Sequence, residues 1–168
     1  RIAGLESSYT RDLGTSAQNF AEGLSRISYT TDLKTATDDA DIVIESVPEK
    51  PQIKHDFYVQ LSAIAPAKTI FASNSSTLVP SQFMADTGRP AQFLNLHFAN
   101  EVWKNNTAEI MGSPKTDPKV YDTVVEFAKE IGMLPIKLKK EQPRYILNSI
   151  LDPYLDAGLT LWAKGVAD

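Results

Sequence analysis

The fold of this chain is decided at Asp41-Ile42-Val43-Ile44-Glu45-Ser46-Val47. The apolar residues of this stretch fall on both faces of an extended strand, which is typical of a strand buried in a parallel sheet. Residues 50–64 follow with helical spacing, Pro66 ends that helix, and residues 69–72 form a second short apolar run. A strand, a helix and a strand in this order predict an α/β fold on a parallel sheet with crossover helices. The apolar face expected for the helix comprises Ile53, Phe57, Leu61 and Ile64.

The rest of the chain continues this alternation of short strands and helices. Residues 1–25 are polar and alanine-rich, with weak helical spacing. Further strands are predicted at residues 27–30, in the run that ends at His97, and at residues 108–111 and 134–138. Further helices are predicted at residues 32–38, 80–85 and 117–131.

A second unit begins after a polar break at residues 139–143. Residues 145–163 form an apolar helical pattern that is too apolar for a solvent-facing helix, so we expect it to need a partner. The pattern divides the chain into two domains, residues 1–140 and residues 141–168. Its leucines at four-residue steps are Leu147, Leu151, Leu155 and Leu159.

Composition excludes several classes of protein. The 168 residues carry a net charge of −4, which argues against general nucleic-acid binding. There is no apolar run of about 18 residues, so no membrane span is expected. No secretory signal is visible, and the absence of cysteine fits a reducing compartment, so we expect a cytoplasmic location.

Candidate chemistry centres on His97, one of only two histidines. His97 ends a largely apolar run, and Glu109 lies in a second apolar run that is expected to pair with the first. A carboxylate beside an imidazole fixes the tautomer of the ring and raises the basicity of the ring. The pair therefore indicates a general base, His97, with a carboxylate, Glu109, that orients it. A buried histidine satisfied by a carboxylate would leave the same pattern, and this segment alone leaves both interpretations open. His55 is expected at the surface, and no metal site is proposed.

Polar residues also follow three predicted strands: Glu49, residues 74–76 and residues 97–100. Taken singly, Glu49 would complement a helix dipole and the serine-rich turn would cap nearby backbone. Ligands of open parallel sheets bind beyond the carboxyl ends of the strands. The convergence of the three groups therefore favours a ligand site.

Three segments together resemble the 3-hydroxyacyl-CoA dehydrogenase family, in the family's order and near its spacing. They are residues 41–49, Phe71-Ala72-Ser73-Asn74-Ser75-Ser76-Thr77-Leu78 and Leu96-His97-Phe98-Ala99-Asn100. Trp103 with residues 105–107 is more similar to the diketoreductase-like branch. The resemblance implies a Rossmann-like domain followed by the first helix of an all-α domain that forms a homodimer.

The resemblance also implies roles for single residues. His97 matches the catalytic base, and Glu109 matches the carboxylate that orients it. Ser76 matches the serine that contacts the reacting oxygen, and Asn148 matches an asparagine that holds the substrate. The positions that match the nicotinamide end of the NAD site are Glu49, Lys54, Asn74 and Asn100. The implied activity is NAD-dependent interconversion of a 3-hydroxyacyl-CoA and its 3-keto form, as in fatty acid metabolism.

The chain departs from the family at its beginning and near the expected acyl group. The family opens with a strand, a G-x-G-x-x-G turn for the pyrophosphate and an acidic residue for the ribose, and none of these is present. We therefore expect a fragment that binds NAD poorly and does not turn over, with the choice between NAD and NADP open. Differences at Ala99, residues 105–106 and Ser149 also leave a small 3-hydroxy or 3-keto acid or ester open as the substrate.

Two other functions compete for the same residues. Ser76, His97 and Glu109 match the nucleophile, base and acid of a hydrolase, but Ser76 lacks the G-x-S-x-G elbow. A non-catalytic dinucleotide-binding relative is the third interpretation. The presence of all four candidate catalytic residues argues against it, because a structural role does not require them.

Overall fold

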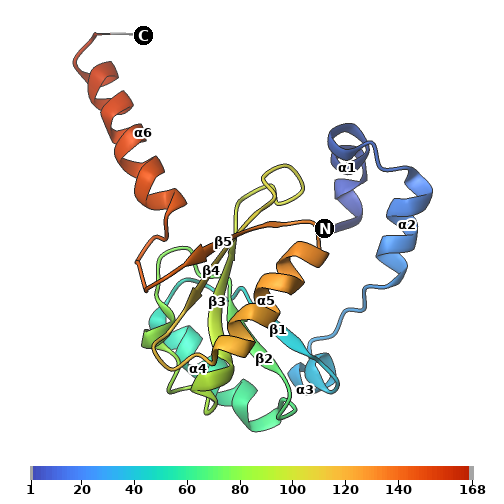
Figure 1. Ribbon diagram of the computed structural model, residues 1–168. Helices are drawn as coiled ribbons and strands as arrows, with labels where there is room; N and C mark the ends of the chain where they lie inside the picture. The colour runs from blue at the N-terminus through green and yellow to red at the C-terminus, as the bar shows by residue number, and fades with distance from the viewer. Residues whose placement is uncertain (1, 167–168) are drawn as a thin grey trace.

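A five-stranded sheet forms the centre of the computed structural model, which describes residues 2–166 (Figure 1). The strands lie in chain order, from β1 at one edge to β5 at the other. The first three strands are parallel, β4 runs antiparallel to β3, and β5 is parallel to β4. The bounds are β1 Ile42–Glu45, β2 Ile70–Ser73, β3 Phe93–Phe98, β4 Thr107–Gly112 and β5 Leu134–Leu138. The predicted α/β, Rossmann-like, mostly parallel fold is confirmed.

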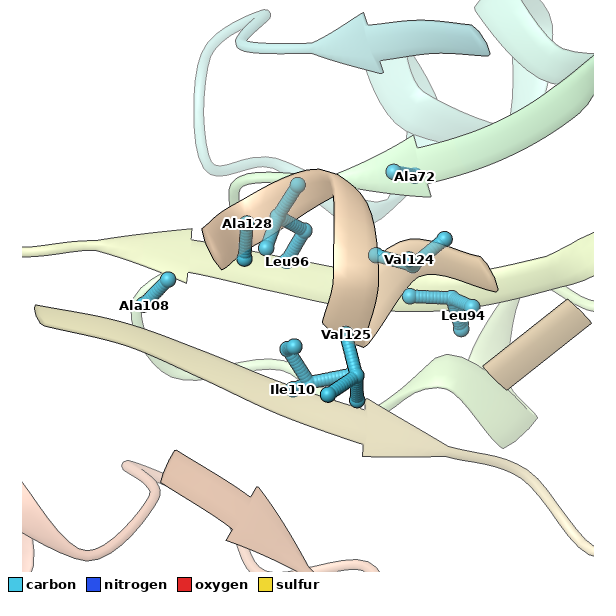
Figure 2. Close-up of a cluster of buried hydrophobic side chains, with 8 residues drawn as sticks. All are labelled: Ala72, Leu94, Leu96, Ala108, Ile110, Val124, Val125 and Ala128. Carbon is cyan, nitrogen blue, oxygen red and sulfur yellow. The ribbon is translucent and has the colours of Figure 1, made fainter. Parts of the chain in front are cut away.

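Helices cover the two faces of the sheet, with α5 (Pro118–Glu130) on one and α4 (Pro51–Ile64) on the other (Figure 1). Because side chains alternate along a strand, each strand contributes to both layers. The α5 layer is a buried aliphatic cluster (Figure 2) of Ala72, Leu94, Leu96, Ala108, Ile110, Val124, Val125 and Ala128. The α4 layer is more aromatic, and its buried members are Tyr58, Leu61, Ala65, Phe71, Phe83 and Phe93.

The remaining helices are not part of the two main helical layers. The short elements are η1 (Ile2–Leu5), α3 (Leu33–Thr37), η2 (Pro80–Gln82) and η3 (Pro90–Gln92), and the N-terminal pair is α1 (Glu6–Leu13) and α2 (Ala17–Ser25). The helix α6 (Leu147–Ala163) projects away from the sheet and buries none of its residues (Figure 1). Among residues 2–166, no helix combines the length and apolarity needed to cross a bilayer.

Four sequence expectations are wrong in detail. Residues 27–30 form no strand, and the Tyr29 side chain is 74% exposed, because no neighbouring strand pairs with this segment. Residues 80–85 form only the 3-10 helix η2 (residues 80–82) and then a turn. Tyr145 precedes α6 rather than opening it.

The fourth concerns the buried side of α4. Its buried residues are Lys54, Tyr58 and Leu61, whereas Ile53 is 37% exposed. The helix is rotated relative to its apolar pattern because Lys54 and Tyr58 satisfy Glu45, a buried carboxylate on β1.

Candidate active site

The candidate site lies on the α4 side of the sheet, at the edge where β1, β2 and β3 end. Because β4 is antiparallel to β3, its first residues lie beside the last residues of β3, and His97 stands opposite Glu109 in the register. Alternation along the strands places polar side chains at buried positions on this side. They are Glu45, Ser73, Asn95, His97 and Glu109.

His97 and Glu109 form the pair that the sequence predicts. The distance from His97 Nδ1 to Glu109 Oε2 is 3.0 Å, and both side chains are buried. An ionised carboxylate only accepts hydrogen bonds, so the imidazole proton resides on Nδ1 when the ring is neutral. Nε2 of that tautomer carries a free lone pair that accepts a proton.

The second oxygen of Glu109 is bound to the start of the last helix. Oε1 accepts hydrogen bonds from the backbone amides of Ile146 (2.9 Å) and Leu147 (3.0 Å). Burial by itself raises the pKa of Glu109, but the hydrogen bonds from His97 and from these two amides outweigh burial and hold the pKa below its usual range. Glu109 is therefore ionised at neutral pH and keeps His97 oriented.

Tyr145 covers the face of the His97 ring. The two ring centroids are 4.7 Å apart with an interplanar angle of 27°, and the Tyr145 hydroxyl accepts a 2.8 Å hydrogen bond from Asn95 Nδ2. Burial raises the pKa of Tyr145 above its usual range, so the phenol stays neutral. The backbone has φ of 66° at Arg144 and 56° at Tyr145, a left-handed conformation that costs roughly 1–3 kcal/mol per non-glycine residue.

An open cleft of about 890 Å³ runs between the end of β3 and α6. Four of the predicted site residues line it: Ser76, His97, Asn100 and Asn148. Asn148 Nδ2 donates to the Ser76 carbonyl oxygen at 3.4 Å, which links α6 to the serine-rich turn. The lining also includes Lys104, Asn105 and Asn106 of the loop between β3 and β4, and Leu151 and Tyr154 of α6.

The other predicted residues form a second group beside the cleft. Lys54 is buried, with its Nζ 2.8 Å from Glu45 Oε1 and 3.3 Å from Glu49 Oε2. Glu49 in turn accepts hydrogen bonds from Ser75 and Thr77. Burial raises the pKa of Glu49, but the bonds from Ser75, Thr77 and Lys54 prevail and lower it. Through Glu49, this group holds the serine-rich turn in place. Lys54 is not among the residues that line the cleft.

Asn74 connects the ends of two strands. Its Oδ1 accepts a 2.9 Å hydrogen bond from the Phe98 amide, so the turn after β2 is attached to the residue that follows His97. Ser76 is exposed at the mouth of the cleft, and the structure shows no hydrogen bond between its hydroxyl and His97 within residues 2–166.

Sequence reasoning missed Glu45, Asn95 and Tyr145. Glu45 and Asn95 each interrupt an apolar strand at a position that alternation assigns to a buried face, and this signal was available in the sequence. Tyr145 offered no such signal, because its contact with His97 arises only when the linker after β5 crosses the sheet.

The chain was compared with known proteins. Residues 3–142 match the family model described as 3-hydroxyacyl-CoA dehydrogenase, NAD binding domain. The chain is 33% identical over 144 residues to the mitochondrial hydroxyacyl-coenzyme A dehydrogenase of Homo sapiens, covering 86% of this chain and 46% of that protein. It is 34% identical over 145 residues to a probable 3-hydroxybutyryl-CoA dehydrogenase of Deinococcus radiodurans, covering 86% of this chain and 51% of that protein.

Solved structures agree with these matches. A diketoreductase structure, described for substrate-directed dual catalysis of dicarbonyl compounds, superposes with a TM-score of 0.94 at 54% identity. The match covers 100% of this chain and 60% of that one. The chain spans about half the length of the curated relatives it matches.

Proposed function

Because this chain belongs to the 3-hydroxyacyl-CoA dehydrogenase family, whose NAD-binding domain it matches, we propose that the full-length protein is an NAD-dependent oxidoreductase that interconverts 3-hydroxy and 3-keto compounds. The observation that carries the proposal is His97, which is held by the ionised Glu109 and lines the same cleft as Asn148. A base that has a fixed tautomer and lines a cleft together with polar side chains suits proton transfer at a bound hydroxyl.

The residues at this edge fit the nicotinamide end of the cofactor. The carboxyl ends of parallel strands are where dinucleotides bind in such sheets, and here Asn100 lines the cleft while Asn74 and Glu49 lie beside it. When bound, the nicotinamide would supply the hydride chemistry, as hydride acceptor in oxidation and as hydride donor in reduction.

The chain's own residues move the proton. During oxidation His97 Nε2 takes the proton of the 3-hydroxyl, and during reduction the imidazolium donates it to the 3-keto oxygen. Glu109 stabilises the positive charge that develops on the ring. The Ser76 hydroxyl and the Asn148 amide, which are neighbours in the lining of the cleft, orient the substrate oxygen.

The substrate class and the second domain are also proposals. The 54% identity to a diketoreductase supports small 3-keto esters and other dicarbonyl compounds as substrates alongside CoA thioesters. We propose that residues 141–168 begin a helical domain through which the full-length protein forms a homodimer. The exposed apolar surface of α6 supports this.

The proposed function is tested by His97→Gln in the full-length protein, with NADH and either acetoacetyl-CoA or a 3-keto ester. Loss of positioned proton transfer should lower kcat roughly a hundred- to ten-thousand-fold, followed as the decrease in NADH absorbance. His55→Gln is the matched control, because His55 is 47% exposed and pairs with Asp86 away from the cleft. An unchanged kcat in His97→Gln, or cofactor-free ester hydrolysis lost in Ser76→Ala, would overturn the proposal.

A further inference from the structure

The end of the segment that joins β5 to α6, together with the first residue of α6, contacts the His97–Glu109 pair through three consecutive residues. The Tyr145 ring stacks on His97, and the Ile146 and Leu147 amides donate to Glu109. The next residue, Asn148, lines the cleft. We propose that Tyr145 is a positioning residue: it fixes the plane of the His97 ring and sets the distance between His97 and the start of α6. This inference rests on the proposed function, because it assigns Tyr145 a task in the proton transfer by His97.

The stack supplies a restraint that Glu109 alone does not. One hydrogen bond at Nδ1 holds one edge of the imidazole, and the ring remains free to tilt about that bond. A neighbouring aromatic face at 4.7 Å opposes the tilt. His97 is thus held at its edge by Glu109 and on its face by Tyr145, while its side chain still lines the cleft.

Tyr145 is itself held at its far end by Asn95. Asn95 and His97 are two residues apart on β3, so their side chains lie on the same face of the sheet, and Tyr145 contacts both. The Asn95 amide nitrogen also donates to the Leu78 carbonyl at 2.8 Å. This second bond sets the orientation of the amide, because the reverse orientation would place two carbonyl oxygens against each other. The hydrogen bond from Asn95 to the buried Tyr145 hydroxyl therefore fixes the position of the Tyr145 ring.

The backbone around Tyr145 is consistent with a positioning role. Arg144 and Tyr145 both have positive φ, which a bulky residue adopts only where the surroundings impose it. Hydrogen bonds from the Arg144 amide to Thr77 and from Ser149 to the Tyr145 carbonyl hold this conformation. The strained bend directs the Tyr145 ring onto His97 and the next two amides onto Glu109.

The test compares Tyr145→Leu and Tyr145→Phe in the full-length protein with NADH and a 3-keto ester. Removing the aromatic face should lower kcat on the order of 10- to 100-fold with a smaller change in KM, because misplacement of a catalytic group acts on the chemical step. Tyr145→Phe keeps the stack and should recover most of kcat. Tyr121→Leu is the control for lost stability, since Tyr121 bonds the Ile110 and Leu138 carbonyls on the α5 side.

A second measurement covers the case in which Tyr145→Leu does not fold. Asn95→Ser removes the amide that holds the hydroxyl and also its bond to the Leu78 carbonyl. Because Tyr145→Phe already lacks the hydroxyl, Asn95→Ser should lower kcat more in the wild-type background than in Tyr145→Phe, by about the small loss that Tyr145→Phe itself causes. Equal effects in both backgrounds, or a folded Tyr145→Leu with wild-type kcat, would overturn this inference. If Tyr145→Leu keeps wild-type kcat while His97→Gln abolishes turnover, the proposed function stands and only the role of Tyr145 fails.

Discussion

Glu109 uses its two carboxylate oxygens for two partners that are far apart in the sequence. One oxygen accepts from His97, and the other accepts from the amides that open α6. A helix N-terminus favours a negative charge, so the helix and the imidazole both stabilise the ionised carboxylate. A single buried residue therefore connects His97, the proposed proton-transfer group, with the helix that carries Asn148.

The lowered pKa of Glu109 predicts a pH-dependent contribution to stability. Because the pKa in the folded state lies below the ordinary value of 4.5, the contribution is fully present above about pH 4.5 and is lost as the pH falls through the folded-state pKa. On acidification below pH 4.5, the free energy of unfolding should fall more steeply in the wild type than in Glu109→Gln. Urea unfolding between pH 6 and pH 3 measures this. Glu130→Gln, on the exposed end of α5, is the control and should follow the wild type.

At the scale of elements, α4 is attached to the sheet by charge as well as by apolar packing. Glu45 accepts hydrogen bonds from Lys54, Tyr58 and Ser73, and all four side chains are buried. A buried ion pair has a large desolvation penalty, which is offset here by these well-placed donors. The group also supports Glu49 and, through it, the serine-rich turn beside the cleft.

Replacing Lys54 alone should lower the free energy of unfolding more than replacing both Lys54 and Glu45, its partner in the buried ion pair. Lys54→Met leaves the Glu45 carboxylate buried without its countercharge, and we expect a loss of about 3–5 kcal/mol in the free energy of unfolding. The double variant Glu45→Gln/Lys54→Met should recover much of that loss, as measured by denaturant unfolding at neutral pH. Lys50→Met, on an exposed residue at the start of α4, should change stability by less than about 0.5 kcal/mol. A double variant as unstable as the sum of its single variants would contradict this account.

At the scale of the whole molecule, α6 stands apart from the sandwich of sheet and helices (Figure 1). Its side chains are apolar around much of the helix, and Leu155, Leu159 and Trp162 are 49%, 59% and 65% exposed. A contiguous exposed apolar surface of this kind marks an interaction site or a source of aggregation.

We therefore expect the 168-residue chain to self-associate through α6. Size-exclusion chromatography should show species larger than the monomer, and a hydrophobic dye should bind. Leu155→Glu with Leu159→Glu should shift the chain towards the monomer, because it places charges on the apolar surface. Thr160→Glu adds a charge at an exposed polar position of the same helix and should leave the association unchanged. A clean monomer that binds no dye would refute this expectation.

Local patterns in the sequence determined the elements of this protein and the edge at which its candidate site lies. Apolar periodicity marked all five strands and the helices α4, α5 and α6, and polar residues after strand ends marked the edge that holds His97 and Asn100. These features depend on neighbours within a few residues, so they can be read without the tertiary structure. The strand predicted at residues 27–30 failed because a strand also needs a pairing partner, which a local pattern does not reveal.

Only the tertiary structure decided which polar residues meet. It turned Lys54 inward to Glu45, and it brought Tyr145 onto His97 and the amides of α6 onto Glu109. These contacts join residues 9 to 48 positions apart. These contacts depend on how α4 is rotated about its axis and on where the linker after β5 passes over the sheet. Both features are set by the need to give buried charged and polar groups their partners, and that need involves the whole fold.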